Sequence, residues 1–258
     1  MSYLQQLFSL EGKIAVVTGA SRGLGNAIAE ALLRAGAHVI LVSANATRLG
    51  EATAAFQAEG LPASLYCCDL ADNSQIAALV EALRQDPGRV DILVNAAGIT
   101  EGHPVLTYPD AVWERTLQVN VTAAFYLARG VAALMAEQQS GAIINLTSIN
   151  AERGFPGNPA YVAAKGALKQ LSKALAVDLA PYGIRVNNIG PGYFHTDMTS
   201  GSWQDPERRA QRSSRTLLGR WGEPADLAGL VIFLASGSSA YITGQDFYID
   251  CGWLAKGL

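Results

Sequence analysis

The residues best suited to acid–base chemistry in this chain are Tyr161 and Lys165, which stand four positions apart. On a helix, residues at this spacing lie on one face, with Cβ atoms about 5–6 Å apart. A phenol with a pKa of about 10 is a poor base at neutral pH, but a neighbouring ammonium group favours its ionised form. The pair is therefore expected to move a proton to or from an alcohol or carbonyl oxygen, with Tyr161 as the proton donor or acceptor.

The sequence around this pair supports the interpretation. Asn158 and Pro159 suit the cap and first turn of a helix that starts just before Tyr161. Ser148 ends an apolar run thirteen residues before Tyr161, at the sheet edge where open α/β folds bind ligands. Its hydroxyl is expected to hold the substrate oxygen. A lone Tyr-x-x-x-Lys pair is common on solvated surfaces, so the presence of Ser148 favours the catalytic interpretation.

A glycine-rich segment lies between an apolar run and a helical stretch near the N-terminus. It reads Thr18-Gly19-Ala20-Ser21-Arg22-Gly23-Leu24-Gly25. Glycines allow a tight turn and a close approach of the backbone to a pyrophosphate, and the helix start offers free N–H groups. Many turns need glycine for other reasons, so it is the strand–turn–helix context that favours cofactor binding. The spacing is Gly-x-x-x-Gly-x-Gly, not the Gly-x-Gly-x-x-Gly of long-chain dehydrogenases.

The scaffold that positions these residues alternates short apolar runs with longer Ala- and Leu-rich stretches. The runs predict strands at 13–18, 38–43, 91–94, 142–147, 184–189 and 246–250, and the stretches predict helices at 24–35, 46–59, 73–85, 110–137, 159–180 and 224–235. This alternation is typical of a doubly wound parallel sheet covered on both faces. We expect one domain over 1–258, with 191–220 as a substrate lid.

Composition narrows the classes of partner. The chain has 19 Lys and Arg against 22 Asp and Glu and no basic run, which argues against nucleic acid. Cys67 and Cys68 are adjacent and Cys251 is distant, so neither a disulfide framework nor a metal site is expected. We recognise no signal peptide and expect no membrane-spanning stretch, and therefore predict a cytoplasmic location.

Taken together, the motifs resemble those of the short-chain dehydrogenase/reductase family, from about residue 11 to the C-terminus. The resemblance rests on the glycine spacing, on Asn95-Ala96-Ala97-Gly98, and on Ser148 followed by Tyr161-x-x-x-Lys165. It implies an α/β fold of the Rossmann type with strand order 3-2-1-4-5-6-7. It also implies that Asn120 is a fourth catalytic residue, which holds a water chain to Lys165. The alternative for Asn120 is a helix side chain bonded to backbone.

The resemblance further implies a nicotinamide dinucleotide cofactor. Lys165 would hold the nicotinamide ribose and Asp69 would contact the adenine. Ala96 replaces the family's usual second asparagine, which weakens a supporting hydrogen bond without abolishing binding. The expected cofactor-binding residues are Gly19, Ser21, Arg22, Gly23, Leu24, Gly25, Ser43, Asp69, Leu70, Asn95, Ala96, Gly98, Tyr161, Lys165, Pro191, Gly192 and Thr196.

Three positions bear on the choice between NADP(H) and NAD(H), and together they favour NADP(H). Ser43 ends the second predicted strand, where NAD-preferring members of the family carry an aspartate that binds the free ribose 2′-hydroxyl. Arg22 stands in the glycine loop, where it can form charge-assisted bonds to a 2′-phosphate. Ala44 stands where many NADP-preferring members have a second arginine, so some use of NAD(H) is also expected.

The expected substrate is a small carbonyl compound or alcohol. Segments 192–196 and 219–224 look most like the sugar-acid and polyol branch of the family, such as gluconate 5-dehydrogenases. The 3-oxoacyl-carrier-protein reductases are the second reading, and a non-catalytic cofactor sensor is an alternative of another class. Arg153 is either a carboxylate anchor or a solvated loop residue. The residues expected near the substrate are His103, Asn150, Arg153, His195 and Trp203.

The predicted helix 110–137 carries apolar residues on nearly all of its faces, among them Trp113, Val121 and Leu134. Such a helix must bury a second face. In the family this helix packs against its copy in a partner subunit, which implies a homotetramer.

Overall fold

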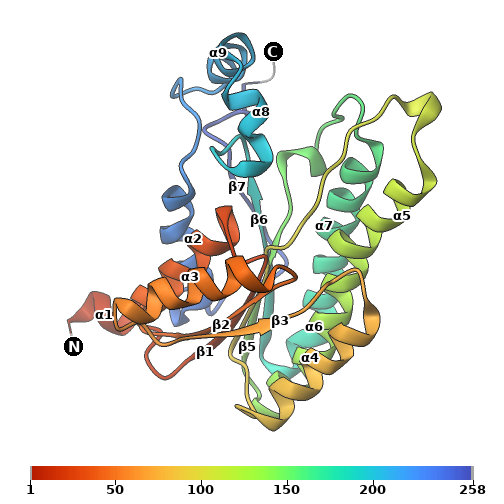
Figure 1. Cartoon of the computed structure of the whole chain (residues 1–258). Coiled ribbons are helices and arrows are strands. Elements are labelled where there is room, and N and C mark those ends of the chain that lie inside the picture. Colours follow the sequence, from red (N-terminus) through yellow and green to blue (C-terminus); the bar gives the residue numbers. More distant parts are fainter. Residues whose placement is uncertain (1, 257–258) are drawn as a thin grey trace.

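The computed structural model describes residues 2–256 and contains one seven-stranded sheet (Figure 1). All neighbouring strands are parallel, in the order β3-β2-β1-β4-β5-β6-β7. The strands are β1 (Ile14–Thr18), β2 (His38–Ser43), β3 (Ala63–Cys67), β4 (Ile92–Asn95), β5 (Gly141–Leu146), β6 (Ile184–Pro191) and β7 (Asp246–Ile249). The predicted Rossmann-type topology and strand order are therefore confirmed.

Helices cover both faces of this sheet and build a separate core on each (Figure 1). On one face lie α2 (Gly23–Arg34), α3 (Ala46–Ala58) and α10 (Ala228–Ala235), whose buried residues include Ile28, Leu49 and Val231. On the other lie α4 (Asn73–Gln85), α6 (Ala123–Gln138) and α7 (Pro159–Leu179), with Leu79 and Leu127 fully buried. A short α1 (Tyr3–Phe8) precedes the sheet.

Strand β3 was not among the apolar runs that we took as strands. It is the edge strand beside β2, and after the buried Ala63 its residues alternate between partly buried and exposed positions. Leu65 on this strand is about half exposed. A half-solvated edge strand lacks the continuous apolar run of a central parallel strand, which explains the omission.

The predicted helix 110–137 is interrupted in its middle. It consists of α5 (Asp110–Leu117), a π-helical turn at Gln118–Thr122, and α6. Single π-helical turns inside α-helices occur frequently at functional sites, and this one carries Asn120. The sequence pattern gave no indication of this turn.

The whole span Asp110–Gln138 is long and apolar enough to cross a membrane by length and composition, contrary to our expectation that no stretch would be. Half of its most apolar window is buried inside the fold, as in a core helix of a globular protein. Leu127, Val131 and Met135 face the sheet, whereas Trp113 is exposed. The helix is thus apolar on the core side and also on part of its outer side.

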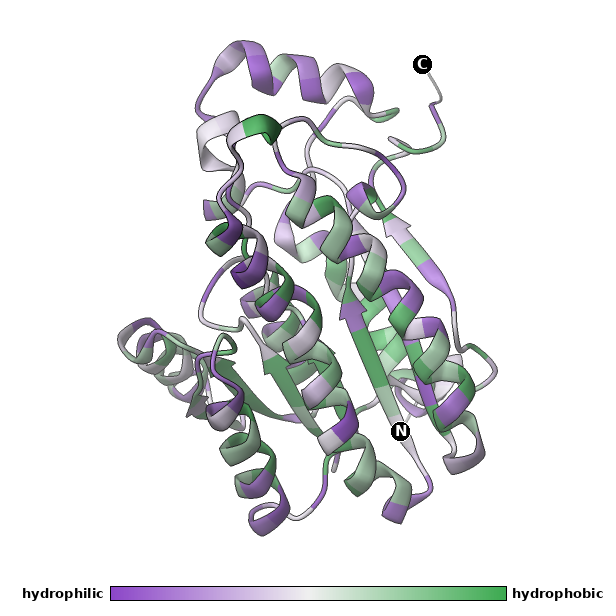
Figure 2. Ribbon diagram, turned by 90° about the vertical axis from the view of Figure 1, so that its right-hand side faces the viewer, coloured by the Kyte–Doolittle hydropathy of each residue, from purple (hydrophilic) through white to green (hydrophobic). Residues whose placement is uncertain are grey.

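Segment 191–220, predicted to be a lid, contains two short helices above the carboxyl ends of β6 and β7 (Figure 1). These are α8 (Ser200–Trp203) and α9 (Pro206–Arg215). Figure 2 shows that α9, at the top of the molecule, is mostly hydrophilic, in contrast to the apolar strands below it. Asp205 caps α9 by accepting bonds from the N–H groups of Glu207 and Arg208.

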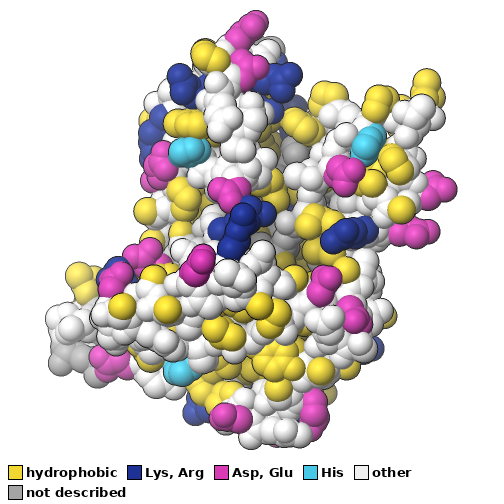
Figure 3. Space-filling model, in the orientation of Figure 1, with side chains coloured by type: hydrophobic (Ala, Val, Ile, Leu, Met, Phe, Trp, Pro, Cys, Tyr) yellow, Lys and Arg dark blue, Asp and Glu magenta, His cyan; other side chains and the backbone are white. Residues whose placement is uncertain are grey.

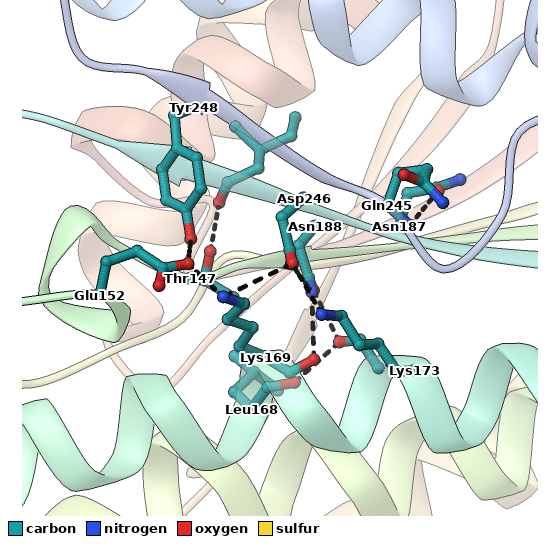
Figure 4. A network of polar contacts seen from close by, with 12 residues as sticks. Thr147, Glu152, Leu168, Lys169, Lys173, Asn187, Asn188, Gln245, Asp246 and Tyr248 are labelled. Atoms are coloured by element: carbon teal, nitrogen blue, oxygen red, sulfur yellow. Dashed lines mark hydrogen bonds and ion pairs between the residues drawn. The ribbon is translucent and has the colours of Figure 1, made fainter. Parts of the chain in front are cut away.

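Hydrogen bonds and ion pairs between polar side chains hold α7 against strands β5, β6 and β7 (Figure 4). Ser172 on α7 is fully buried, and its hydroxyl lies 2.8 Å from Asn145 Nδ2 and 2.6 Å from Asn188 Oδ1. Asn188 in turn donates to Asp246 on β7 at 2.7 Å. Lys173, one residue along α7, pairs with the same carboxylate at 3.2 Å. Helix α7 is therefore held to β5, β6 and β7 by specific bonds as well as by apolar packing.

The same network reaches the loop that follows β5. Figure 4 shows Lys169 and Tyr248 both pointing at the Glu152 carboxylate. These contacts hold the pKa of Glu152 below its usual range, with the Lys169 hydrogen bond as the largest cause. The loop that carries Glu152 is thus anchored to α7 on one side and to β7 on the other.

Removing the Ser172 hydroxyl should destabilise the fold. In Ser172→Ala the Asn145 amide and the Asn188 carbonyl oxygen lose a buried partner, and we expect a loss of about 1–3 kcal/mol in the free energy of unfolding. Ser214→Ala is the matched control, because its hydroxyl bonds only to Gln211 on the exposed α9. Urea denaturation would measure both. Equal midpoints for the two variants would contradict a structural role for the network.

Candidate active site

Tyr161, Lys165 and Ser148 meet at the carboxyl end of β5. Tyr161 and Lys165 lie in the first two turns of α7, and the Lys165 ammonium is 5.6 Å from the centre of the Tyr161 ring. Lys165 is buried and donates to the carbonyl oxygen of Leu146, the last residue of β5, at 2.7 Å. The Ser148 side chain accepts from the Asn150 N–H at 3.1 Å and lines the same cavity wall as Tyr161, where it lowers the pKa of the phenol. The structure thus brings together the three groups that the sequence singled out.

Burial sets the protonation of the pair. It lowers the pKa of Lys165 to about 8, and it raises the pKa of Tyr161 above its ordinary value, against a smaller lowering by Ser148. We had expected the lysine to bring the tyrosine pKa down. That expectation is wrong in this structure, because Lys165 is not among the groups that shift the pKa of the phenol and desolvation governs it. Tyr161 is therefore a neutral phenol with a proton to give.

Asn120 lies close to this group but is bonded elsewhere. Its side chain accepts from the Ile99 N–H at 2.8 Å and donates to the Ile99 carbonyl at 2.9 Å. Gly98 lies between it and the lysine, since a Cβ atom there would be 3.5 Å from both Asn120 Oδ1 and Lys165 Nζ. The side chain thus makes the backbone bonds of the alternative interpretation, and it also fixes the strand end that faces Lys165.

Asn158 occupies the cap position of α7, with Pro159 in the first turn, as expected. Its side chain makes no capping bond and instead donates to the Thr100 hydroxyl at 2.6 Å. The expectation that the Asn158 side chain caps the helix is therefore wrong, because this side chain bonds to Thr100 in the neighbouring loop after β4.

A cavity of about 660 Å³ extends from the catalytic group to the glycine loop. Figure 3 shows the molecule hollowed between the α8–α9 side and the α5–α7 side. Ser148, Tyr161 and Lys165 line one end. Of the residues expected to bind a dinucleotide, those that line the cavity are Gly19, Ser21, Arg22, Gly23, Leu24, Gly25, Ser43, Asp69, Leu70, Ala96, Gly98, Tyr161, Lys165, Pro191, Gly192 and Thr196.

Asn95 alone of that set lies behind the wall. Its side chain is buried and donates to Asn145 Oδ1 at 2.8 Å, and its own Oδ1 has no hydrogen-bond partner. Asn95 therefore extends the polar network of α7 to β4 and supports the cavity from behind.

The glycine loop fits a pyrophosphate. A Cβ at Gly25 would lie 2.3 Å from the Gly19 carbonyl oxygen, and one at Gly19 would lie 2.8 Å from the Ala97 Cα. Only glycine allows this close packing of turn, helix and strand. Arg22 stands at the cap position of α2 without a side-chain capping bond, so the first N–H groups of the helix have no side-chain cap.

Positive groups and hydroxyls surround the end of β2. The Ser43 hydroxyl lies 3.0 Å from that of Ser21, and Ala44, Asn45 and Arg48 line the same part of the cavity. Arg22 is exposed and pairs with Asp197 at 2.7 Å across the cavity mouth. Arg48, which we had not included in the site, makes no ion pair among residues 2–256.

The five residues expected near the substrate fall into separate places. Asn150 lines the cavity, and Arg153 lines a second one next to it. His103 is paired with Glu101 at 2.8 Å and packs edge-on against Tyr108.

His195 and Trp203 stack on each other with ring centres 4.2 Å apart and line neither cavity. Trp203 also packs edge-on against the buried Trp221. This aromatic group holds α8 against segment 219–224, so the structure gives His195 and Trp203 a packing role there and does not place them beside the substrate cavity.

Sequence reasoning missed several residues around the second cavity, namely Tyr193, Arg212, Arg215, Trp253 and Lys256. The two arginines belong to segment 191–220, for which the sequence predicted a lid and no binding residue at these positions. The C-terminal residues carried no motif that pointed to the site. Within the described part of the chain, no three His, Cys, Asp or Glu side chains gather closely enough to hold a metal ion.

Comparisons with known proteins agree with this geometry. A family model described as enoyl-(acyl carrier protein) reductase matches residues 19–254. The chain is 40% identical over 246 residues to gluconate 5-dehydrogenase of Gluconobacter oxydans, covering 95% of this chain and 96% of that one. It is 37% identical to a 3-oxoacyl-[acyl-carrier-protein] reductase of Vibrio harveyi, covering 95% and 98%.

A solved structure gives the same picture. A gluconate 5-dehydrogenase from Burkholderia cenocepacia, in complex with NADP and tartrate, superposes with a TM-score of 0.94 at 34% identity, covering 98% of this chain and 99% of that one. The glycine loop, the Ser148–Tyr161–Lys165 group and matches over nearly the full length lead to one conclusion: the chain belongs to the short-chain dehydrogenase/reductase family of oxidoreductases.

Proposed function

We propose that this protein transfers a hydride between NADP(H) and a sugar acid, interconverting a secondary alcohol and a ketone. The observation that carries the proposal is that one cavity joins the two groups of residues. It has Ser148, Tyr161 and Lys165 at one end and the glycine loop, Ser43 and Arg22 at the other. The gluconate 5-dehydrogenase relatives support a sugar acid as substrate. The 3-oxoacyl reductase relatives keep acyl thioesters as the second candidate.

The cofactor would supply the hydride, and the residues of the chain would handle the proton. In ketone reduction, the Ser148 hydroxyl and the neutral Tyr161 phenol hold the carbonyl oxygen, and Tyr161 gives its proton as the oxygen becomes an alkoxide. Lys165, held by the Leu146 carbonyl, stabilises the phenolate that forms. In alcohol oxidation Tyr161 takes the proton back. A non-catalytic sensor would not need this complete set.

NADP(H) is the cofactor that the end of β2 suits. Ser43 places no carboxylate where the ribose 2′-hydroxyl of NAD would need one, and Arg22 and Arg48 supply positive charge beside it. Relatives solved with bound NADP support the same choice. The Arg22–Asp197 pair competes with a phosphate for the guanidinium, so NAD(H) remains a secondary cofactor.

The outer side of α5 and α6 supports a proposal about the assembly of the enzyme. We propose a cytoplasmic homotetramer in which the outer face of α5 and α6, with Trp113 exposed and Phe125 half-buried, packs on a partner subunit. Segment 191–220 would act as the substrate lid, with α8 and α9 above the cavity.

Replacing Tyr161 by phenylalanine should abolish turnover while keeping the ring. We expect Tyr161→Phe to lower kcat by at least about 10²-fold, the lower end of general acid–base contributions. NADPH binding, followed by fluorescence, should stay close to wild type. The assay is NADPH-dependent reduction of a keto sugar acid, with Tyr108→Phe as a control outside the cavity. Near-normal turnover in Tyr161→Phe would exclude the mechanism.

Cofactor choice is tested at three positions. We expect Arg22→Ala to erode the preference for NADP(H), and Ala44→Arg and Asp197→Asn to sharpen it, because the last change frees Arg22 from its partner. One charge-assisted contact corresponds to about tenfold in kcat/KM ratio. The measurement is kcat/KM for both cofactors in each variant. A wild type that clearly prefers NAD(H) would overturn the assignment.

The depressed pKa of Lys165 predicts a pH-dependent stability in the cofactor-free protein. Between pH 8 and the ordinary lysine value of about 10.4, the unfolded chain binds more protons than the folded one. The free energy of unfolding should therefore rise with pH across this window, by about 3 kcal/mol in total. Lys165→Met lacks this contribution, so the difference between the two proteins isolates it from other groups. Parallel pH profiles for the two proteins in urea denaturation would show that Lys165 is not held in this way.

A further inference from the structure

A second cavity, of about 560 Å³, lies beside the catalytic one. The two share part of their walls, at Ile149, Asn150, Phe155, Tyr193 and Arg212. A substrate whose reacting carbon lies at Tyr161 can therefore extend from the first cavity into the second. No part of the hydride transfer requires this second space.

The second cavity is lined by four cations and by no carboxylate. Arg153 comes from the loop after β5, Arg212 and Arg215 come from α9, and Lys256 comes from the C-terminal segment. None of the four makes an ion pair within residues 2–256. Other arginines of this region do, since Arg208 pairs with Asp205 and Arg220 with Asp226. Figure 3 shows the positive side chains gathered around α9.

The nearby acids are occupied by other partners. Glu152 is bound to Lys169 and Tyr248, and the Asp250 carboxylate accepts the N–H groups of Gly252 and Leu254. Four positive charges around one cavity repel each other, and an anion bound among them would relieve this repulsion.

Aromatic rings orient the cations without neutralising them. The Arg212 guanidinium lies 4.4 Å from the centre of the Tyr193 ring, and that of Arg215 lies 5.6 Å from Trp253. Lys256 donates to the Ser214 carbonyl at 2.5 Å, which ties the C-terminal segment to α9. Three of the four cations are thus positioned, two by aromatic packing and one by a hydrogen bond, with donors left over for a ligand.

We propose that this cavity binds a doubly charged oxyanion, a phosphate monoester, at the end of the substrate that does not react. A single carboxylate would leave most of the positive charge unmatched, whereas a phosphate offers two charges and several acceptor oxygens to the arginine forks. The inference rests on the proposed function for the reacting end and extends it: the substrate class is a phosphorylated sugar or sugar acid. The anion site itself is independent of which alcohol is oxidised.

The binding test uses the protein saturated with NADP⁺, so that the phosphate cradle of the cofactor is blocked. Calorimetry would compare inorganic phosphate, malonate and acetate. We expect phosphate to bind at least about tenfold more tightly than acetate. Malonate is a dicarboxylate that carries two charges without the geometry of a phosphate, so it tests whether charge alone explains binding. If malonate bound as tightly as phosphate, the preferred ligand would be a dicarboxylate and the assignment of a phosphate monoester would be overturned.

Two variants in the cavity and one matched control locate the site. Arg215 and Lys256 line only the second cavity. The variants Arg215→Gln and Lys256→Gln should each weaken phosphate binding by about tenfold. Arg208→Gln removes the same charge from the same helix, but Arg208 lines neither cavity, and it should change binding by less than about twofold. Equal losses in Arg208→Gln and Arg215→Gln, or no phosphate binding by wild type, would overturn the proposal.

Kinetics separates this inference from the proposed function. For a keto sugar and its phosphate monoester, wild type should show the higher kcat/KM on the ester, and Arg215→Gln should remove most of that advantage through KM while leaving kcat unchanged. Turnover of sugar acids without any advantage for the ester would refute the second site and leave the proposed function standing. Phosphate binding in the cavity without turnover of any sugar or sugar acid would refute the function and leave the site standing.

Discussion

The arrangement of the site depends on one buried cation. The Lys165 ammonium lies inside the protein, and burial alone accounts for the fall of its pKa to about 8. A buried ammonium group is stable only where hydrogen-bond acceptors are available to it, and the carbonyl oxygen of Leu146 at the end of β5 provides one. This contact fixes the first turns of α7 against the sheet and therefore fixes Tyr161 above Ser148. The network through Ser172, Asn188 and Asp246 holds the rest of α7 in the same register.

Local spacing was enough to predict that Tyr161 and Lys165 share a helix face and that the sheet is parallel and doubly wound, whereas the strand order came from the family resemblance. The four-residue step from Tyr161 to Lys165 places both on one side of a helix, and Ser148 follows a strand whose neighbours are equally apolar. Features that depend on tertiary structure could not be predicted in this way. The π-helical turn at Asn120 coincides with two bonds to Ile99, 21 residues away. The direction of the Tyr161 pKa depends on how deeply the fold buries the ring, which no spacing reveals.

The clustering of positive charge around the second cavity could not be predicted from the sequence either. Arg212 and Arg215 look like solvated residues of a polar lid when read along the chain, and α9 has no buried residue. The fold changes this interpretation, because it brings Arg153 from the β5 loop and Lys256 from the C-terminal segment to the same cavity. More than one hundred residues separate Arg153 from Lys256. A cluster assembled from such distant segments has no local signal, so only the topology shows it.

The pKa values of Tyr193 and Tyr161 are set by different groups. Arg212 and Arg215 lower the pKa of Tyr193, although burial is the larger effect and raises it overall. Neither arginine contributes to the pKa of Tyr161, which is governed by burial and by Ser148. The positive charge therefore acts on the wall between the cavities and stops short of the reacting phenol. If the second cavity binds the anionic end of the substrate as proposed, its charges are separated from the proposed proton donor, and affinity for the substrate could be tuned at α9 without changing the acid–base chemistry at α7.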